Sequence, residues 1–513
     1  MFLNIQSLSL VGTLSTAGLI FSVYYAGLVI HRIFFSPLRS FPGYEFYYDV
    51  VLGGQYTFHI AELHEKYGSV VRINPHEIHV HDPEFYDKLY AGAGKRRHKW
   101  HWATRGFGAE MSTFATELHE VHKARRAALN PFFSMARVRR LESVIKERAD
   151  AILQRLHEFR ENGRVVPFDI LFGAYSIEHP NFDNDFHEAC VNGGRQLFLT
   201  RQFPILLTLI KIIPPKWLLS TYPSIASFFA MHQVKQVKAL YDAPKADSDG
   251  GDLPTVFHEI LYSKLPEHEK AFRRLATDGG ALVGAGTVTT AWAATTAVYY
   301  LVSNPDCLLQ LKSEIADAIQ TAADAGQDKE CGLPLSVLEK LPYLSAVIQE
   351  GLRLSYGVAT RLARIAPDEA LVVQSSKTSK TSRTGSEEWI IPPGTPVSMT
   401  QLLILRDEGI FPSASTFRPE RWLEQPHLDR YQVAFCKGSR ICLGKNLAMA
   451  ELYIMLAALF IHYGSKSVRF SNDIGYLELW KTDVDDVECR VDAFVPLPKI
   501  GSKGVRFTVH TWQ

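Results

Sequence analysis

The residues best suited to chemistry lie in one stretch, Phe435 to Gly444, with the sequence Phe-Cys-Lys-Gly-Ser-Arg-Ile-Cys-Leu-Gly. Within it, Cys442 follows a basic residue, Arg440, and precedes an apolar, helix-forming run from Asn446 to Phe460. A thiolate at a helix N-terminus is stabilised by unpaired backbone N–H groups and by the positive end of the helix dipole. A deprotonated, hydrogen-bonded sulfur of this kind suits an axial ligand of haem iron. The alternative is an ordinary structural cysteine in a turn.

The spacing across the whole stretch favours the first interpretation. The pattern Phe-x-x-Gly-x-Arg-x-Cys-x-Gly resembles the haem-binding loop of the cytochrome P450 superfamily at every fixed position. The resemblance implies haem b as the cofactor, with Cys442 as the axial ligand of its iron. It also implies that Arg440 pairs with a haem propionate and that Phe435 and Gly444 border the cofactor. Cys436 is not at a ligand position.

A long helix is expected from Leu275 to Val302, and its middle reads Gly-Ala-Gly-Thr-Val-Thr-Thr up to Thr290. A glycine inside a helix costs about 1 kcal/mol relative to alanine, so the two glycines indicate close approach or a local kink. The segment resembles the oxygen-activation segment of the same family and places Thr289 on its threonine. Val288 stands where that segment has an acid. Valine cannot relay a proton, so we expect proton delivery through water, Thr289 and Thr290.

Further basic residues match propionate partners of the family. His122 and Arg126 are four residues apart and share a helical face. They fall on a Trp-x-x-x-Arg pair, with histidine in place of tryptophan, and Arg364 matches another propionate partner. Without the resemblance, the His122–Arg126 segment would be interpreted as a solvated basic face.

A structural lock is implied on the proximal side of the haem. Glu350 and Arg353 are three residues apart on one helical face, a pair that is usually exposed and contributes only a few tenths of a kcal/mol. In the family this Glu-x-x-Arg pair joins an arginine from a Pro-Glu-Arg segment. That third member is Arg421 here.

The N-terminal region predicts a membrane anchor. Residues 1–31 contain no Asp, Glu, Lys or Arg, and the apolar run from 8 to 30 spans about 35 Å as a helix, enough for a bilayer core. The rival, a cleaved signal peptide, lacks a positively charged start. Arg32 and Arg39 follow the span, which places the remainder in the cytoplasm by the positive-inside rule. We therefore expect a single-pass protein of the endoplasmic reticulum membrane, with a proline-rich elbow over 32–43 and one catalytic domain over 44–513.

Other features set limits or depart from the family pattern. The formal charge, 55 basic minus 54 acidic residues, is +1 and argues against a nucleic-acid partner. The six cysteines form no CxxC pair, so neither a zinc site nor a disulfide framework is indicated. The segment 167–182 is too short for the family's usual connection and helix. An apolar stretch from Phe198 to Trp217 predicts a monotopic membrane contact or the roof of the substrate cavity.

A small hairpin is expected from Val70 to His81, with His79 and His81 as surface residues rather than metal ligands.

The resemblance extends from Phe41 to the C-terminus. It implies the cytochrome P450 fold, mostly α with a smaller β region and an N-terminal transmembrane helix. The phrases Leu-Asn-Pro-Phe-Phe-Ser and Gly-Ala-Gly-Thr-Val-Thr-Thr-Ala-Trp look most like fungal secondary-metabolism members of the trichodiene-oxygenase-like kind.

The implied function is a monooxygenase that inserts one oxygen atom from dioxygen into a small hydrophobic substrate, such as a terpenoid or polyketide-like metabolite. Electrons would come from NADPH through NADPH–cytochrome P450 reductase, with cytochrome b5 as a second candidate partner, because no GxGxxG follows a strand. Lys437 is expected to help dock the acidic reductase. Two alternatives stay open. Val288 favours a redox-independent haem-thiolate isomerase or dehydratase, and the short 167–182 segment favours a degenerate haem-binding protein.

Overall fold

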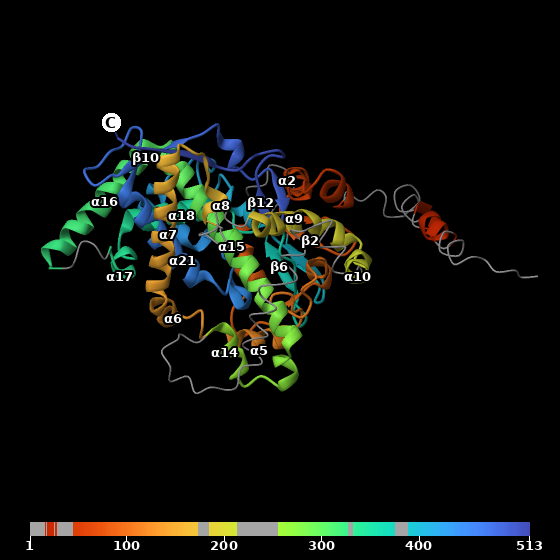
Figure 1. The fold of residues 1–513 in the computed structure, drawn as a ribbon. Helices are drawn as coiled ribbons and strands as arrows, with labels where there is room; N and C mark the ends of the chain where they lie inside the picture. Colours follow the sequence, from red (N-terminus) through yellow and green to blue (C-terminus); the bar gives the residue numbers. More distant parts are fainter. Residues whose placement is uncertain are drawn as a thin grey trace, which may run out of the picture.

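The computed structural model describes residues 45–172, 184–212, 255–326, 332–374 and 388–512, together with residues 16, 18–24, 26 and 27 (Figure 1). The described residues between 16 and 27 are helical, within the predicted membrane helix. The elbow over 32–43, the later parts of the 167–182 and 198–217 segments and the loop 375–386 lie outside the described residues. The described part is mostly helical with a smaller β region, as predicted.

The centre of the fold is the long helix α15 (Phe272–Ser303), which crosses the middle of the molecule in Figure 1. It contacts α18 (Pro342–Ser355), α21 (Lys445–His462) and the short helix α8 (Phe168–Phe172). Small residues allow α15 and α18 to pack closely, because a Cβ added at Gly351 would lie 2.9 Å from the Cβ of Ala297. The C-terminal half of α15 is therefore a core element.

The remaining described helices surround this core. They are α2 (Tyr56–Tyr67), α3 (Tyr86–Leu89), α4 (His101–Thr104), α5 (His119–Leu129), α6 (Met135–Arg140), α7 (Glu142–Asn162), α9 (Asn184–Gln202), α10 (Ile205–Ile212), α14 (Val256–Leu261), α16 (Pro305–Asp324), α17 (Leu335–Leu338), α19 (Gln401–Leu405) and α20 (Glu420–Glu424). Short 3-10 or π turns include η2 (Tyr47–Val51), η4 (Arg105–Phe107) and η8 (Gly438–Arg440).

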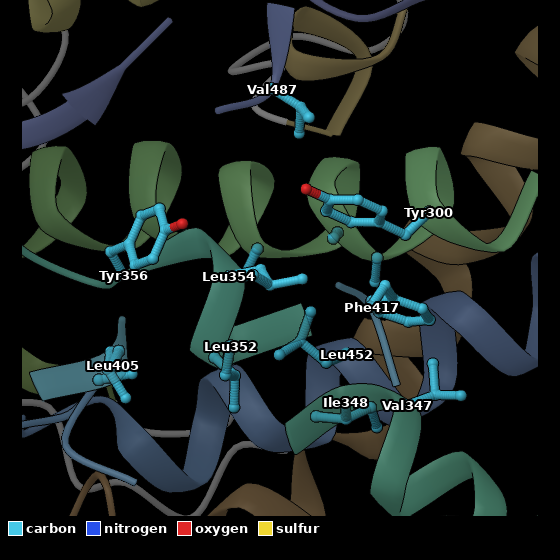
Figure 2. Close-up of a cluster of buried hydrophobic side chains, with 14 of the residues drawn as sticks. Tyr300, Val347, Ile348, Leu352, Leu354, Tyr356, Leu405, Phe417, Leu452 and Val487 are labelled. Atoms are coloured by element: carbon cyan, nitrogen blue, oxygen red, sulfur yellow. The ribbon is translucent and has the colours of Figure 1, made fainter. Parts of the chain in front are cut away.

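Figure 2 shows the core where α15, α18 and α21 meet. Tyr300 of α15 stacks on Phe417, with ring centroids 5.1 Å apart and planes 5° from parallel. Leu352 of α18 and Leu452 of α21 lie in the same cluster, and both are buried. Burying each such side chain contributes about 1.5–3 kcal/mol. This packing fixes the positions of the three helices that carry the candidate site.

The β region contains two sheets and two separate hairpins. The first sheet has the order β1-β2-β8-β5-β3, and the second has the order β4-β13-β10-β9. The strands of the first sheet are β1 (Val70–Arg72), β2 (Ile78–Val80), β8 (Pro396–Ser398), β5 (Arg364–Ile365) and β3 (His98–Lys99). The strands of the second sheet are β4 (Val166–Pro167), β13 (Arg506–His510), β10 (Gly475–Leu479) and β9 (Tyr463–Ser465). The hairpins pair β6 (Leu371–Gln374) with β7 (Glu388–Ile391) and β11 (Val491–Ala493) with β12 (Val495–Leu497). The antiparallel pairing of β1 with β2 confirms the hairpin predicted at 70–81.

The prediction that His79 is a surface residue is wrong. Strand β2 lies between β1 and β8 in the sheet, and His79 is fully buried where His64 of α2 contacts it. Its Nδ1 lies 2.6 Å from His64 Nε2, and its Nε2 lies 2.9 Å from the Thr400 hydroxyl. His81 is half-buried. No metal-binding group of three or more His, Cys, Asp or Glu side chains occurs among the described residues.

Two described helices, Phe272–Ser303 and Lys445–His462, are long and apolar enough to cross a membrane by length and composition alone. They are α15 and α21, which contact each other and several further helices of the fold. Their apolar character is explained by burial in the core.

Candidate active site

The loop that carries Cys442 is fixed by backbone hydrogen bonds on both sides. The Cys442 N–H donates to the Phe435 carbonyl at 2.9 Å, which closes the loop on itself. The Ser439 N–H donates to the Ala91 carbonyl at 3.0 Å, which ties the loop to the segment after α3. Gly438 makes this contact possible. Its φ is +72°, and an added Cβ would lie 2.2 Å from the Tyr90 carbonyl oxygen.

The sulfur of Cys442 lies at the N-terminus of α21, as the sequence predicts for the loop. Burial raises the pKa of the thiol, whereas hydrogen bonds from the backbone N–H groups of Gly444 and Lys445 and the charge of Arg126 lower it. The side chain nevertheless has an accessible surface. Burial is the largest influence, so the pKa of Cys442 is raised overall, while the backbone donors and the nearby cation favour the thiolate form.

Four cations from separate segments surround one point beside this loop. Lys99 of β3 is directly opposite Arg364 of β5 in the sheet, and both act on the buried His122 of α5 together with Arg126 and Arg440. Burial, followed by the fields of Arg440, Lys99, Arg126 and Arg364, lowers the pKa of His122 to about 2. His122 is therefore neutral and offers one ring N–H as a donor.

The hydrogen bonds that the structure gives these cations go to backbone carbonyls. Arg440 donates to the carbonyls of Thr116 and Glu117, both at 2.7 Å. Arg126 donates to the carbonyl of Ile441, and Lys99 to that of Phe114. Burial lowers the pKa of Lys99 well below its usual value, and Arg364 and Arg440 lower it further. A cluster with this excess of positive charge matches a ligand with two carboxylates.

The middle of α15 carries Thr289 and Thr290, the residues predicted for the distal side. The Thr289 hydroxyl donates to the Ala285 carbonyl one turn earlier, at 2.7 Å. Gly286 has no atom within 4 Å of the position of an added Cβ, and the same is true of Gly444 beside Cys442. Helix α15, which carries Gly286, contacts α21, which follows Gly444.

The proximal lock is fully buried. Arg353 donates to both carboxylate oxygens of Glu350, at 2.9 and 2.8 Å, and Arg421 donates to Glu350 at 3.1 Å. The structure adds Trp422, whose indole N–H donates to Glu350 at 2.9 Å, and the Arg418 backbone N–H, which donates at the same distance. The Glu350–Arg353 pair is therefore buried and is not the weak exposed pair that its helical spacing alone would indicate.

Two participants were missed by sequence reasoning, namely Lys99 and Trp422. Neither gave a signal, since each lies in a segment with several other polar or aromatic residues. Arg361, three residues before Arg364, forms ion pairs with Glu45 at 2.8 Å and Glu77 at 3.0 Å.

The donor set fits a haem. The Cys442 thiol at a helix N-terminus would hold the iron, the two glycines leave space beside the backbone, and the cation cluster would bind two propionates.

Comparison with known proteins agrees with this geometry. Residues 257–473 match the family model "Cytochrome P450". The chain is 41% identical over 512 residues to cytochrome P450 monooxygenase tpcC of Cochliobolus heterostrophus, with 95% of each chain covered. It is 39% identical to cytochrome P450 monooxygenase astB of Talaromyces wortmannii, covering 95% of this chain and 97% of that protein. It is 37% identical to tryptophan 6-hydroxylase fscE of Fusarium equiseti, covering 96% of each. The chain therefore belongs to the cytochrome P450 family, whose cofactor is a haem-thiolate, and it is an oxygenase.

Proposed function

We propose that the chain inserts one oxygen atom from dioxygen into a small hydrophobic substrate, with electrons from NADPH delivered by NADPH–cytochrome P450 reductase. The observation that carries this proposal is the arrangement of Cys442 at the N-terminus of α21, beside the cation cluster, with α21 in contact with α15, the helix that carries Thr289. Cytochrome b5 is a second candidate electron donor. The catalytic domain would span 44–513, after an anchor over 1–31 and an elbow over 32–43.

Each part of the site has a separate task in this proposal. Haem, when bound through a thiolate, supplies the activation of dioxygen. Cys442 would hold the iron, with Phe435 and Gly444 bordering the ring. The propionates would be bound by Arg126, Arg364, Arg440 and Lys99, with His122 as a neutral donor. Thr289 and Thr290 would order protons on the distal side, because each hydroxyl can donate one hydrogen bond and accept another.

Three aromatic rings support a hydrophobic substrate. Phe107 lies 5.1 Å from Phe114 and 4.8 Å from Phe494, measured between ring centroids. The Lys99 ammonium lies 3.8 Å from the Phe114 centroid, so the rings border the cation cluster. One relative is named a tryptophan 6-hydroxylase. We therefore propose a substrate of aromatic, terpenoid or polyketide-like character, bound against these rings.

An exposed apolar surface supports contact with the endoplasmic reticulum membrane beyond the N-terminal helix. Phe46 and Phe203 form an edge-to-face pair at 5.8 Å, which joins the start of η2 to the segment before α10. Val51, Leu209 and Ile212 are 59%, 51% and 72% exposed on these two elements. Such a surface is rarely left to water on a soluble protein. A chain that lacks residues 1–31 is expected to sediment with phospholipid vesicles, and its failure to sediment would contradict this proposal.

Lys437 is less available for docking the reductase than the sequence indicates. Its ammonium pairs with Asp87 at 2.7 Å. Because Asp87 is well exposed, an incoming acidic partner would have to displace this carboxylate.

An assay with purified chain, reductase, NADPH and a panel of hydrophobic substrates tests the proposal. Oxygenated product is expected only when NADPH and dioxygen are both present. Turnover without them would contradict the monooxygenase and support the isomerase alternative that Val288 favours.

A further inference from the structure

A single residue with a strained backbone joins strands β11 and β12. Phe494 lies between Ala493 and Val495, which pair with each other, and its φ is +71°. A positive φ is costly for a bulky L-residue and persists only where the surrounding structure enforces it, most often at functional sites. The strain at Phe494 is therefore maintained by its contacts with the rest of the fold.

The carboxylate of Asp492 provides the first of these contacts. Its Oδ1 accepts a hydrogen bond from the Phe494 N–H at 2.9 Å, and its Oδ2 accepts one from the Thr57 hydroxyl at 2.6 Å. Asp492 is 1% exposed and Thr57 is fully buried, so bulk water does not compete for these bonds. The Phe494 carbonyl accepts from the Ala359 N–H at 3.0 Å. Both backbone polar groups of Phe494 are thus held in place.

The segment from Gly54 to Thr57, at the start of α2, also binds the backbone of the β11–β12 hairpin. The Asp492 N–H donates to the Gly54 carbonyl at 3.0 Å, and the Gln55 amide donates to the Arg490 carbonyl at 2.9 Å. This approach is close enough to require glycine, because the φ of Gly54 is +78° and an added Cβ would overlap the Asp492 carbonyl oxygen. The position of the hairpin is therefore set from the segment 54–57.

The ring of Phe494 is the group that these contacts position. Its centroid lies 4.8 Å from that of Phe107 and 5.9 Å from that of Phe114, and both pairs are edge-to-face. Because Phe494 alone joins the two strands, a change in its φ would move its ring relative to the other two. Asp492 and Thr57 are buried, so they would affect a ligand at these rings through Phe494.

We propose that Asp492 and Thr57 are positioning residues, which set ligand selectivity by holding Phe494 in its strained conformation. The geometry assigns this role to hydrogen bonding rather than to charge. An asparagine at position 492 could keep both bonds, because its amide oxygen accepts from the Phe494 N–H and its NH2 group donates to a Thr57 hydroxyl that turns to accept. The inference rests on the proposed function, since it places the substrate against the three rings.

The first test requires neither substrate nor turnover. A trifluoromethyl label on the Phe494 ring gives a fluorine NMR resonance that reports its contact with the neighbouring rings. This resonance should shift or broaden in Asp492→Ala and in Gly54→Ala and keep its position in Asp492→Asn. Gly53→Ala is the control, because Gly53 also has a positive φ, +72°, but an added Cβ there meets open space. An unchanged resonance in both Asp492→Ala and Gly54→Ala would overturn the inference.

The second test measures ligand selectivity in the haem-loaded chain. Imidazole and clotrimazole, an imidazole with three aryl rings, both bind haem iron through a ring nitrogen, but only clotrimazole needs contact with apolar side chains. In Asp492→Ala and Thr57→Val, the Kd for clotrimazole, measured from the shift of the Soret band, should rise by about tenfold. The Kd for imidazole should change by less than about twofold. Asp492→Asn and Thr57→Ser should keep the wild-type ratio of the two constants.

Asp486→Ala is the matched control for the loss of a buried carboxylate. Asp486 is 4% exposed and accepts hydrogen bonds from the Ser502 hydroxyl at 2.6 Å and from the Asp483 N–H at 3.1 Å. Its removal should lower stability in a similar way, since it also leaves buried donors unpaired. The ratio of the two dissociation constants should stay at the wild-type value.

A wild-type ratio in both Asp492→Ala and Thr57→Val would overturn the inference, and Thr57→Val alone decides if Asp492→Ala does not fold. An equal change of the ratio in Asp492→Asn and Asp492→Ala would also overturn it, because charge would then be the cause. A wild-type chain that binds imidazole but not clotrimazole contradicts the proposed substrate site instead, while the fluorine resonance still tests the role of Asp492.

Discussion

One carboxylate, that of Glu350, holds together the proximal side of the molecule. It faces two guanidinium groups, Arg353 and Arg421, and all three side chains are buried. The excess positive charge is met by backbone carbonyls, since Arg353 also donates to those of Leu405 and Ala414 at 2.8 and 2.7 Å. A buried ion set of this kind joins α18 to the segment that precedes the cysteine loop. Removing one partner from such a set is strongly destabilising, because the remaining charge is then buried without a partner.

Replacing Glu350 with Gln should therefore destabilise the protein strongly. The variant leaves two buried guanidinium groups without a counter-charge, which costs about 3–5 kcal/mol. Urea unfolding followed by circular dichroism measures the change. Glu424→Gln is the control, because Glu424 pairs with Arg418 at the surface, and it should cost less than about 1 kcal/mol. Equal midpoints for the two variants would show that the lock is not structural.

At the scale of elements, α2 and β2 are joined by a chain of neutral imidazoles. The Gly68 carbonyl can only accept, so His64 Nδ1 carries a proton and donates to it at 2.7 Å. His64 Nε2 must then accept from His79 Nδ1, and His79 Nε2 accepts from the Thr400 hydroxyl. Protonation of His64 would place its Nε2–H against the Nδ1–H of His79, two donors facing each other. Burial accordingly lowers the pKa of His64 to about 4, with a further contribution from His81.

This chain should make stability depend on pH. The pKa of His64 is about 4 in the folded state and near 6.5 unfolded, so the unfolded state binds protons first as pH falls. Stability is fully present above pH 6.5 and decreases by about 3 kcal/mol towards pH 4. Unfolding at several pH values should show a shallower decrease in His64→Gln than in the wild type. His157→Gln on α7, a partly exposed histidine, should keep the wild-type slope. Parallel slopes for wild type and His64→Gln would contradict the assignment.

The position of the cysteine loop depends on the close contact between Gly438 and the segment after α3. Gly438→Ala combines a positive φ with a Cβ 2.2 Å from the Tyr90 carbonyl oxygen. Gly394→Ala also has a positive φ, +82°, but meets open space. We expect the first variant to lose thermal stability and bound haem, and the second to cost only about 1 kcal/mol of backbone strain. Similar losses in both variants would mean that strain, not the contact, governs the loop.

Motifs with strict spacing were predictable from the sequence. The long helix expected over 275–302 is observed over 272–303, and the Glu350, Arg353 and Arg421 triad meets as expected. The partners that spacing does not encode were missed. Lys99 reaches the cation cluster through the pairing of β3 with β5, and His79 is buried where it contacts His64 of α2 and Thr400. Such contacts depend on tertiary pairing between distant segments.

At the scale of the whole molecule, the fold gathers one site from distant parts of the chain. The cation cluster combines β3, α5, β5 and the cysteine loop, while the distal side comes from α15. No single segment contains enough of these groups to bind a dianionic ring. The central claim is that this assembly holds a haem through the Cys442 thiolate.

The carbon-monoxide difference spectrum of the reduced protein tests that claim most directly. Cys442→Ala should lose the thiolate-shifted Soret band. Cys436→Ala should keep it, because Cys436 is a buried cysteine of the same loop with no place among the ligands. A thiolate-shifted band that survives in Cys442→Ala, or one that is lost only in Cys436→Ala, would contradict the account.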